Sequence, residues 1–144
     1  MGEEEPAVQS YEGERNSAGQ RHGTATATFA NGDKYTGGYA DGLRSGEGVY
    51  ESASGDKYTG SYAENLRHGA GVMVYGDGST YEGAWSRSYR HGEGIYDYPN
   101  GDHYDGAWAA GAKHGLGVYF FAESRSQFYG YWDCGSFLGG TWTH

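Results

Sequence analysis

The sequence predicts an all-β protein, an elongated single-layer antiparallel β-meander of about six 23-residue repeats. First, an aromatic residue followed two positions later by glycine recurs at a nearly fixed interval along the chain. Second, glycine supplies 28 of the 144 residues, which is too many for a helical protein because each interior glycine costs a helix roughly 1 kcal/mol. Third, the chain holds 15 tyrosines and therefore has ring surface to bury. A fixed period of about 20–50 residues is typical of repeat proteins, whose units pack on their neighbours.

The repeats divide the chain into a short tail and one array. Residues 1–10 contain Glu3, Glu4 and Glu5 and are predicted to form an acidic, disordered N-terminal tail. Residues 11–142 form the predicted array, whose units begin at residues 11, 35, 58, 81, 104 and 128. The last unit is degenerate, with Leu138 in the place of a histidine and Thr141 in the place of a glycine. It is predicted to be a capping repeat, because terminal repeats are commonly atypical.

Each unit opens with a strand of the pattern aromatic-x-Gly-x-aromatic. Because alternate residues of a strand point to one face, both rings and the glycine share a face of the sheet. In the unit that starts at Tyr81, Gly83 and Trp85 share the face of Tyr81, and Glu82 points the other way. The glycines are expected to leave spaces into which the rings of a neighbouring unit pack.

A second strand completes the unit. A loop of five to seven residues is predicted to end in a basic-His-Gly-x-Gly motif, for example residues 67–71 (RHGAG). The second strand then closes on a pair such as Asn31-Gly32 or Asp77-Gly78. Such pairs are a strong hairpin signal, so a tight turn with positive φ at both residues is predicted there. About twelve strands result, and at a spacing of about 4.8 Å they make a ribbon on the order of 55 Å long.

These residues resemble the MORN (membrane occupation and recognition nexus) repeat. The resemblance rests on the aromatic-x-Gly-x-aromatic strand, the His-Gly-x-Gly motif and the Asn-Gly pair at a 23-residue period, and it covers residues 11–142. The unit at residue 11 departs from the pattern at Arg15, and the unit at residue 35 has Ser45 in place of histidine. The resemblance implies a MORN-repeat fold and a scaffold for protein–protein interaction.

The first unit carries a narrower resemblance. Behind an acidic leader, its residues 15–16, 18–19 and 21–23 (Arg-Asn, Ala-Gly and Arg-His-Gly) are similar to the opening of MORN-containing radial spoke head proteins of motile cilia. This implies a non-catalytic structural component of the axoneme of a cilium or flagellum, in the cytoplasm and cytoskeleton. Its implied partners are other radial spoke head and axonemal proteins in a large multi-protein complex, and its implied role is to support the regulation of axonemal dynein.

Two other functions are open to a chain of MORN repeats: a membrane or phosphoinositide adaptor, and a regulatory module of a partner enzyme. A formal net charge of −9 disfavours nucleic acid and anionic membranes as partners, because both repel an acidic protein. The single cysteine, Cys134, allows no internal disulfide and fits a reducing compartment. The sequence shows no signal peptide and no apolar run near the roughly 20 residues of a membrane span, so we expect a cytosolic protein.

The aromatic residues are the candidate interaction site. A single-layer sheet has no second layer to cover its rings, and Tyr and Trp are enriched in binding surfaces. The hypothesis is that the rings pack along the ribbon and also offer a groove to a partner helix or peptide. The predicted groove consists of Tyr39, Tyr62, Trp85, Trp108, Trp132, Tyr50, Tyr96 and Tyr119. A basic rim that would meet acidic partner segments consists of Arg21, Arg44, Arg67, Arg90 and Lys113. The alternatives are that the rings are only the core between repeats and that the basic residues are a solvated edge.

No catalytic residue, cofactor or metal site is predicted. His68, His91 and His114 recur two strands apart, about 9.5 Å, which is too far to share a zinc ion with bonds of about 2.0 Å. They are predicted to be loop histidines hydrogen-bonded to the backbone. No Cys/His pattern surrounds Cys134, so we expect no nucleophile there and no enzymatic activity.

Overall fold

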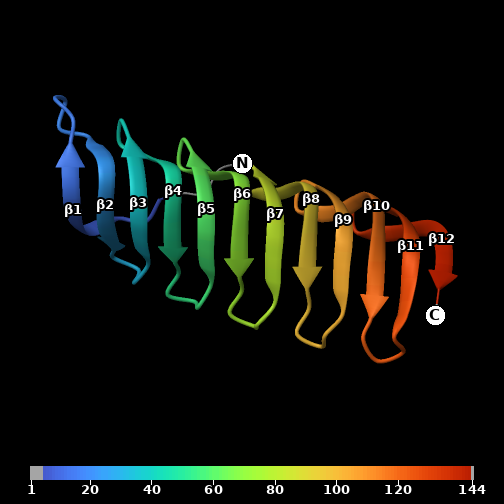
Figure 1. Ribbon diagram of the computed structural model, residues 1–144. Helices are drawn as coiled ribbons and strands as arrows, with labels where there is room; N and C mark the ends of the chain where they lie inside the picture. The colour runs from blue at the N-terminus through green and yellow to red at the C-terminus, as the bar shows by residue number, and fades with distance from the viewer. Residues whose placement is uncertain (1–4, 144) are drawn as a thin grey trace.

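The computed structural model describes residues 5–143, which form a single antiparallel sheet. Twelve strands lie in chain order from β1 to β12, each hydrogen-bonded to its neighbours in sequence (Figure 1). No helix occurs among residues 5–143. The predicted all-β, single-layer antiparallel meander is confirmed.

The strands alternate between about seven and about nine residues, in keeping with the two strands predicted for each repeat. Their bounds are β1 (Val8–Arg15), β2 (Arg21–Phe29), β3 (Lys34–Ala40), β4 (Leu43–Glu51), β5 (Lys57–Ala63), β6 (Leu66–Val74), β7 (Thr80–Ser86), β8 (Tyr89–Asp97), β9 (His103–Ala109), β10 (Ala112–Phe121), β11 (Ser126–Asp133) and β12 (Ser136–Thr143).

The first strand starts earlier than predicted, inside the segment expected to be a disordered tail. β1 begins at Val8, which pairs with Phe29, and Ser10 pairs with Thr28. Ala7 extends this pairing, because its carbonyl accepts a hydrogen bond of 2.8 Å from the Ala30 amide. Residues 1–4 of the predicted tail lie outside the described residues.

Tight turns join the two strands of every repeat after the first, where the sequence predicted a loop of five to seven residues. Between β9 and β10 the turn consists of Ala110 and Gly111, with φ values of 50° and 87°. Positive φ at both central residues is the type I′ turn, whose twist matches that of the flanking strands. The same pattern recurs at residues 41–42, 64–65, 87–88 and 134–135. The predicted loop is therefore wrong for these five repeats, whereas residues 16–20 between β1 and β2 do form a five-residue loop.

The Asn-Gly pairs lie in a different turn from the one predicted. The Gly101 amide donates to the Tyr98 carbonyl at 3.0 Å, and the Tyr98 amide donates to the Asp102 carbonyl at 2.9 Å. Only Gly101 of the pair has positive φ, at 93°. This is a type I turn followed by a left-handed glycine, the usual three-residue hairpin, and Pro99 fits its first central position. The prediction of a two-residue turn with positive φ at both residues is therefore wrong here.

The His-Gly motifs lie within strands and not in loops. In β6 the residues His68, Gly69 and Ala70 stand opposite Ser61 alone, because Gly60 pairs with Gly71 while Tyr62 pairs with Arg67. The extra residues make a β-bulge, and Gly69 supplies the positive φ of 85° that the bulge needs. The motif therefore specifies a bulge, which twists the strand and aims the basic residue before it.

The core is a row of rings on one face of the sheet, here called the ringed face; the opposite face is the outer face. Tyr58 lies 5.3 Å from Tyr62 in its own repeat and 5.4 Å from Trp85 in the next, both edge to face at 85°. Edge-to-face ring pairs contribute about 0.5–1.5 kcal/mol each beyond the area they bury. The alternation runs in order through Tyr11, Tyr39, Tyr35, Tyr62, Tyr58, Trp85, Tyr81, Trp108, Tyr104 and Trp132.

Candidate interaction face

The first part of the predicted groove lies in the core. Exposed fractions of 3–6% leave these five side chains little surface to offer: Tyr39, Tyr62, Trp85, Trp108 and Trp132. Two of the indole nitrogens also have backbone partners, because Trp85 donates to the Gly71 carbonyl at 3.2 Å and Trp108 to the Gly94 carbonyl at 3.1 Å. These residues therefore act as the inter-repeat core, which was the alternative to a binding role.

The second part of the predicted groove is half-buried on the ringed face. Tyr50, Tyr96 and Tyr119 pack against the core and keep part of their rings in solvent. Each hydroxyl bonds a turn residue of the preceding repeat: Tyr50 donates to Asp33 at 2.6 Å and Tyr119 donates to Asp102 at 2.9 Å. These three tyrosines are therefore partly open rings of the ringed face held by hydrogen bonds, and Tyr75 and Tyr98 are partly buried beside Tyr96.

The turn aspartates link successive repeats. Asp33 also accepts a hydrogen bond from the Ala53 amide at 2.8 Å, and Asp102 accepts one from the Ala122 amide at 2.9 Å. Burial acts to raise the pKa of Asp33, but the bonds from Tyr50, Ala53 and Asn31 outweigh it and hold the pKa below its ordinary value. The ionised carboxylate is thus the form that the fold prefers.

The basic residues do not form a rim; they lie over the rings of the ringed face. The Arg44 guanidinium carbon stands 5.0 Å from the Tyr50 ring centre and 5.1 Å from that of Tyr62. Only 4% of the Arg44 side chain is exposed. The same stacking holds for Arg21, Arg67, Arg90 and Lys113, and these five residues are here called the basic row. The bulge explains the difference from the prediction, because it turns the residue before the His-Gly pair toward the rings.

Each arginine of the basic row also braces the next turn along the ribbon. Arg90 donates from Nη2 to the Gly111 carbonyl at 2.6 Å, and its own carbonyl accepts from the Gly111 amide at 3.0 Å. Arg44 does the same with Asn65, at 3.0 Å in both directions. Lys113 differs, since its ammonium reaches the Tyr98 hydroxyl at 3.1 Å instead. The row is therefore part of the fold as well as a line of positive charge.

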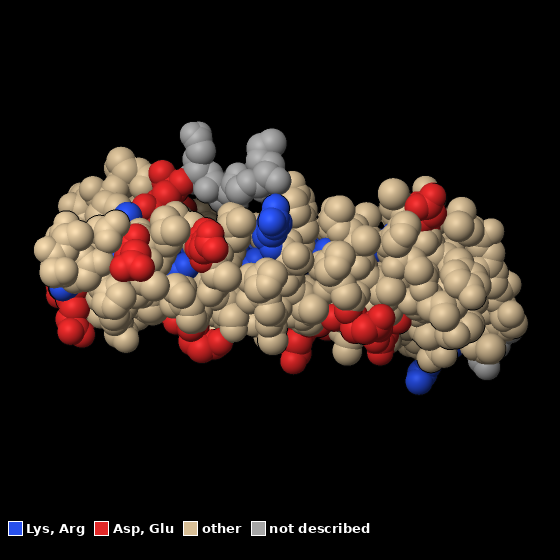
Figure 2. Space-filling model, turned by 90° about the horizontal axis from the view of Figure 1, so that it is seen from above, with Lys and Arg blue, Asp and Glu red and all other residues tan. Residues whose placement is uncertain are grey.

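An open hollow lies between the rings and the basic row. It has a volume of about 350 Å³ and is lined by side chains of β4, β5 and β6 and by Pro6 of the leader, among them Arg44, Tyr50 and Arg67. Seen from the side of the two-residue turns, blue patches of Lys and Arg follow the long axis of the molecule (Figure 2). This hollow gives its part of the ringed face the shape of a binding site.

The leader segment carries a residue that the sequence reasoning missed. Glu5 points its carboxylate into the basic row, with Oε1 2.9 Å from Arg21 Nη2 and Oε2 3.8 Å from Arg44 Nε. Its side chain is only 16% exposed. The sequence does carry a signal for this contact, because residues 3–5 are three consecutive glutamates and the basic residues recur at one per repeat.

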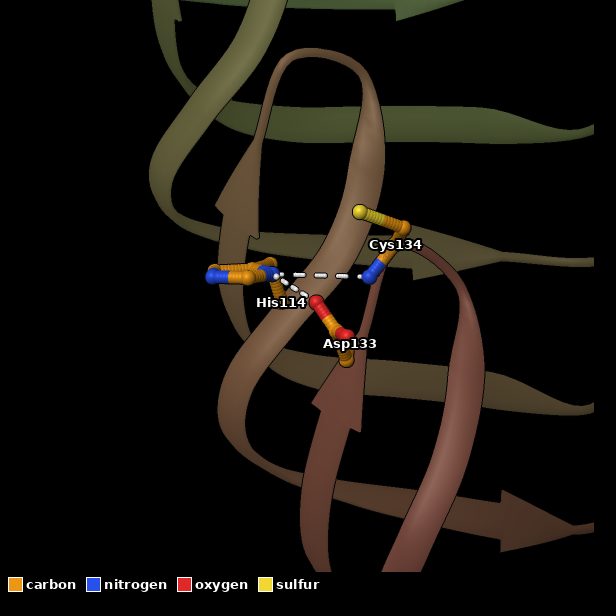
Figure 3. A group of neighbouring side chains, drawn as sticks. All are labelled: His114, Asp133 and Cys134. Atoms are coloured by element: carbon orange, nitrogen blue, oxygen red, sulfur yellow. Dashed lines mark hydrogen bonds and ion pairs between the residues drawn. The ribbon is translucent and has the colours of Figure 1, made fainter.

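A cluster of possible metal ligands lies near the C-terminal end, formed by His114, Asp133 and Cys134 (Figure 3). His114 Nδ1 accepts a hydrogen bond from the Cys134 amide at 3.4 Å, and Asp133 Oδ1 lies 3.3 Å from the same nitrogen. His22 repeats this arrangement with the Asp41 amide at 3.2 Å. Hydrogen bonding to Asp133 and its negative charge raise the pKa of the Cys134 thiol, which disfavours the thiolate. The three residues therefore lie together because His114 hydrogen-bonds the turn at Cys134, as His22 does the turn at Asp41.

A comparison with protein-family models agrees with the repeat architecture. The family model described as "MORN repeat" matches residues 17–34, 35–57, 58–80, 81–103 and 104–123, together more than two thirds of the chain. No curated protein matches the sequence. One similar solved structure is the "SAS-4 (dCPAP) TCP domain in complex with a Proline Rich Motif of Ana2 (dSTIL) of Drosophila Melanogaster", at 14% identity and a TM-score of 0.33, covering 91% of this chain and 84% of that one. Within residues 5–143 no helix has the length and hydropathy of a membrane span.

The matched repeats begin at residues 35, 58, 81 and 104, as the sequence period predicted, and only the first match begins later than the predicted residue 11. A family model that covers most of a chain, on a sheet of one strand pair per repeat, identifies the family. The chain belongs to the MORN-repeat family.

Proposed function

We propose that this protein is a non-catalytic scaffold that binds partner proteins through its ringed face. The observation that carries the proposal is the hollow of about 350 Å³ on that face, lined by half-buried rings and by arginines of the basic row. Tyrosine, tryptophan and arginine supply most of the binding energy in protein interfaces. The sheet beneath the hollow is held by strand pairing and ring packing along its whole length, so a partner meets a preorganised surface.

We further propose that the scaffold works in motile cilia or flagella, as a component of the radial spoke head. There it would hold neighbouring axonemal proteins and support the regulation of dynein. The support for this is the resemblance of the leader and first repeat to MORN-containing radial spoke head proteins, carried by residues 15–16, 18–19 and 21–23.

The test is localisation and co-purification in a ciliated cell that lacks the endogenous protein. The tagged full chain is expected in the axoneme, with spoke head proteins among those that co-purify. Tyr96→Ala is expected to reduce co-purification, because it removes a half-buried ring of the ringed face. Tyr129→Ala, which removes an exposed ring of the outer face, is the matched control. Circular dichroism of both variants distinguishes lost binding from lost folding. Intact spoke heads in the null strain, or a protein found only outside cilia, would refute the ciliary proposal.

A further inference from the structure

Two members of the basic row, Arg90 and Lys113, carry positive charge that the described residues do not neutralise. Arg90 and Lys113 have no carboxylate within ion-pair distance among residues 5–143. Burial and the neighbouring charge of Arg90 both lower the pKa of Lys113, so the ammonium lies in an unfavourable environment. An anionic group placed here would relieve the repulsion between the two cations.

At the other end of the row one such group is already bound. Glu5 reaches across two repeats, to Arg21 and to Arg44, and Pro6 after it lines the hollow. This is a carboxylate of an extended segment seated on the row, and it shows which chemistry the row accepts. Its origin in the same chain makes it an internal ligand.

The fit of Glu5 is incomplete. Three buried polar atoms at this end find no hydrogen-bond partner among the described residues, namely Glu5 Oε2, Arg21 Nη1 and the Tyr39 hydroxyl. A buried polar group without a partner costs free energy, whereas a bidentate carboxylate–guanidinium pair is one of the strongest polar contacts in proteins. A carboxylate that satisfied these atoms would bind better than Glu5 does, so Glu5 is an occupant that can be displaced.

The spacing of the row sets the conformation of its ligand. Basic residues of successive repeats lie two strands apart, about 9.5 Å. Three residues of a polyproline II segment span about 9.3 Å and make one turn, so every third side chain points the same way. A polyproline II segment that runs along the ribbon therefore places every third side chain over a basic residue, whereas in a β-strand the side chains at i and i+3 point to opposite faces.

We propose that the basic row binds an extended acidic segment of a partner protein, with one carboxylate per repeat, and that Glu5 is a built-in competitor for the first two positions. This rests on the proposed role of the ringed face as an interaction surface and names the chemistry of the partner. The partner must displace Glu5 to occupy the whole row, so the leader sets a threshold for binding.

The test measures binding of a labelled synthetic peptide with glutamate at every third residue to the full chain, by fluorescence anisotropy. A peptide with glutamine at the same positions is the control ligand. The glutamate peptide is expected to bind, more weakly as salt rises, and the glutamine peptide is not. Glu5→Gln is expected to tighten binding about tenfold, because it removes the competing carboxylate. Glu12→Gln, an exposed glutamate on the outer face of β1, is expected to change nothing.

A second pair of variants tests the far end of the row. Lys113→Gln is expected to weaken peptide binding about tenfold, since it removes one charge that faces the ligand. Lys57→Gln, an exposed lysine on the outer face of β5, is its control. Thermal unfolding of each variant verifies the fold, and Lys113→Gln is expected to fold well because it relieves a buried charge.

Three results would overturn the inference. The first is that the wild type and Glu5→Gln bind the glutamate peptide with equal affinity, and the second is that the glutamate and glutamine peptides bind equally well. The third is that Lys113→Gln and Lys57→Gln lose the same amount of affinity for the glutamate peptide. Displacement of the peptide by vesicles of phosphatidylserine and phosphatidylcholine would show a general anion surface and would also overturn it. Peptide binding without axonemal localisation would refute the proposed ciliary function alone. Localisation without binding of the glutamate peptide would refute the acidic ligand alone.

Discussion

At the scale of single residues, the ring of each repeat's first tyrosine depends on a glycine in the same repeat. The Tyr81 ring lies flat over Gly94 of the paired strand, and its hydroxyl donates to the Ala84 carbonyl at 2.8 Å. A Cβ at Gly94 would lie 2.2 Å from the Tyr81 hydroxyl oxygen and 2.4 Å from ring carbon Cζ. The expectation that glycines receive rings of a neighbouring repeat was therefore wrong in detail, since strand pairing brings the repeat's own glycine beneath the ring. Glycine is required at these positions because a Cβ would overlap the tyrosine ring, and not because the backbone adopts a conformation that only glycine tolerates.

We predict that Gly94→Ala lowers the free energy of unfolding by about 2–3 kcal/mol, as overpacking of a filled core does. The ring cannot move aside cheaply, because Tyr81 is fully buried and its hydroxyl is bonded. Urea unfolding followed by tryptophan fluorescence measures the change. Gly139→Ala is the matched control, because a Cβ there meets nothing within 4 Å, and its effect should stay within about 0.5 kcal/mol. Equal effects of the two substitutions would contradict the packing argument.

At the scale of elements, the sequence predicted the strands and the repeat period well and the connections poorly. Rings and glycines at alternate positions give an unambiguous period of two, so the aromatic-x-Gly-x-aromatic pattern predicted β7 and β9. The turns failed because Asn-Gly fits both a type I′ turn and a type I turn followed by a left-handed glycine. One type I′ turn holds Asp41-Gly42, a pair with a strong turn signal, but the other four hold pairs such as Ala110-Gly111 that carry none.

The sequence predicted which residues make up the candidate site but not how deeply each of their side chains is buried. The aromatic and basic residues are all on the ringed face, but periodicity cannot tell a covered ring from an open one on a single-layer sheet. Trp85 is covered by Tyr58 and Tyr81 from two repeats, which depends on the repeat-to-repeat distance. The position of Arg44 over the rings follows from a bulge that the sequence reading had assigned to a loop.

The turn assignment gives a prediction that distinguishes type I′ turns within the repeats, as in the structure, from type I′ turns at the Asn-Gly-type pairs between repeats, as the sequence predicted. Ala110 has a φ of 50°, a left-handed conformation that costs alanine about 1–2 kcal/mol and suits asparagine. Ala110→Asn is therefore expected to raise the free energy of unfolding by about 0.5–1 kcal/mol. Ser54→Asn, at the residue before Gly55 where the sequence predicted positive φ, is the control and is expected to change it little. Thermal unfolding by circular dichroism measures both, and a larger gain at residue 54 would contradict the turn assignment.

The arginine braces give a second prediction for elements. Arg90→Lys keeps the charge but loses the bond from the guanidinium to the Gly111 carbonyl and the planar stacking on Trp108. We expect a loss of about 1–2 kcal/mol in the free energy of unfolding, from one charge-assisted hydrogen bond. Arg87→Lys, at an exposed position of the turn between β7 and β8, is expected to be neutral. If both variants unfold at the same denaturant concentration as the wild type, the brace contributes nothing.

At the scale of the whole molecule, the row of buried tyrosines, here called the tyrosine ladder, is expected to make the fold less stable at alkaline pH. Burial raises the pKa of Tyr81 and Tyr104 to about 12, and it raises the pKa of Tyr35 and Tyr58 as well. In the unfolded chain tyrosine ionises near its ordinary pKa of about 10. A group whose pKa is higher in the folded state stabilises the fold fully below the unfolded pKa, and this contribution is lost as pH rises through the folded pKa.

Because each tyrosine lies between rings of two repeats, ionisation of one weakens its neighbours' packing. We predict that stability is constant up to a pH of about 10 and falls steeply toward about 12, with tyrosinate absorbance rising together with loss of β-sheet circular dichroism. Tyr81→Phe is the matched variant: it is less stable at neutral pH, having lost the bond to Ala84, but loses less stability between those pH values because one ionisable group is gone. Absorbance of the buried tyrosines that rises near pH 10 with an intact sheet would show that the ladder is open to solvent. Unfolding that is complete in one step would show that the ladder couples all twelve strands.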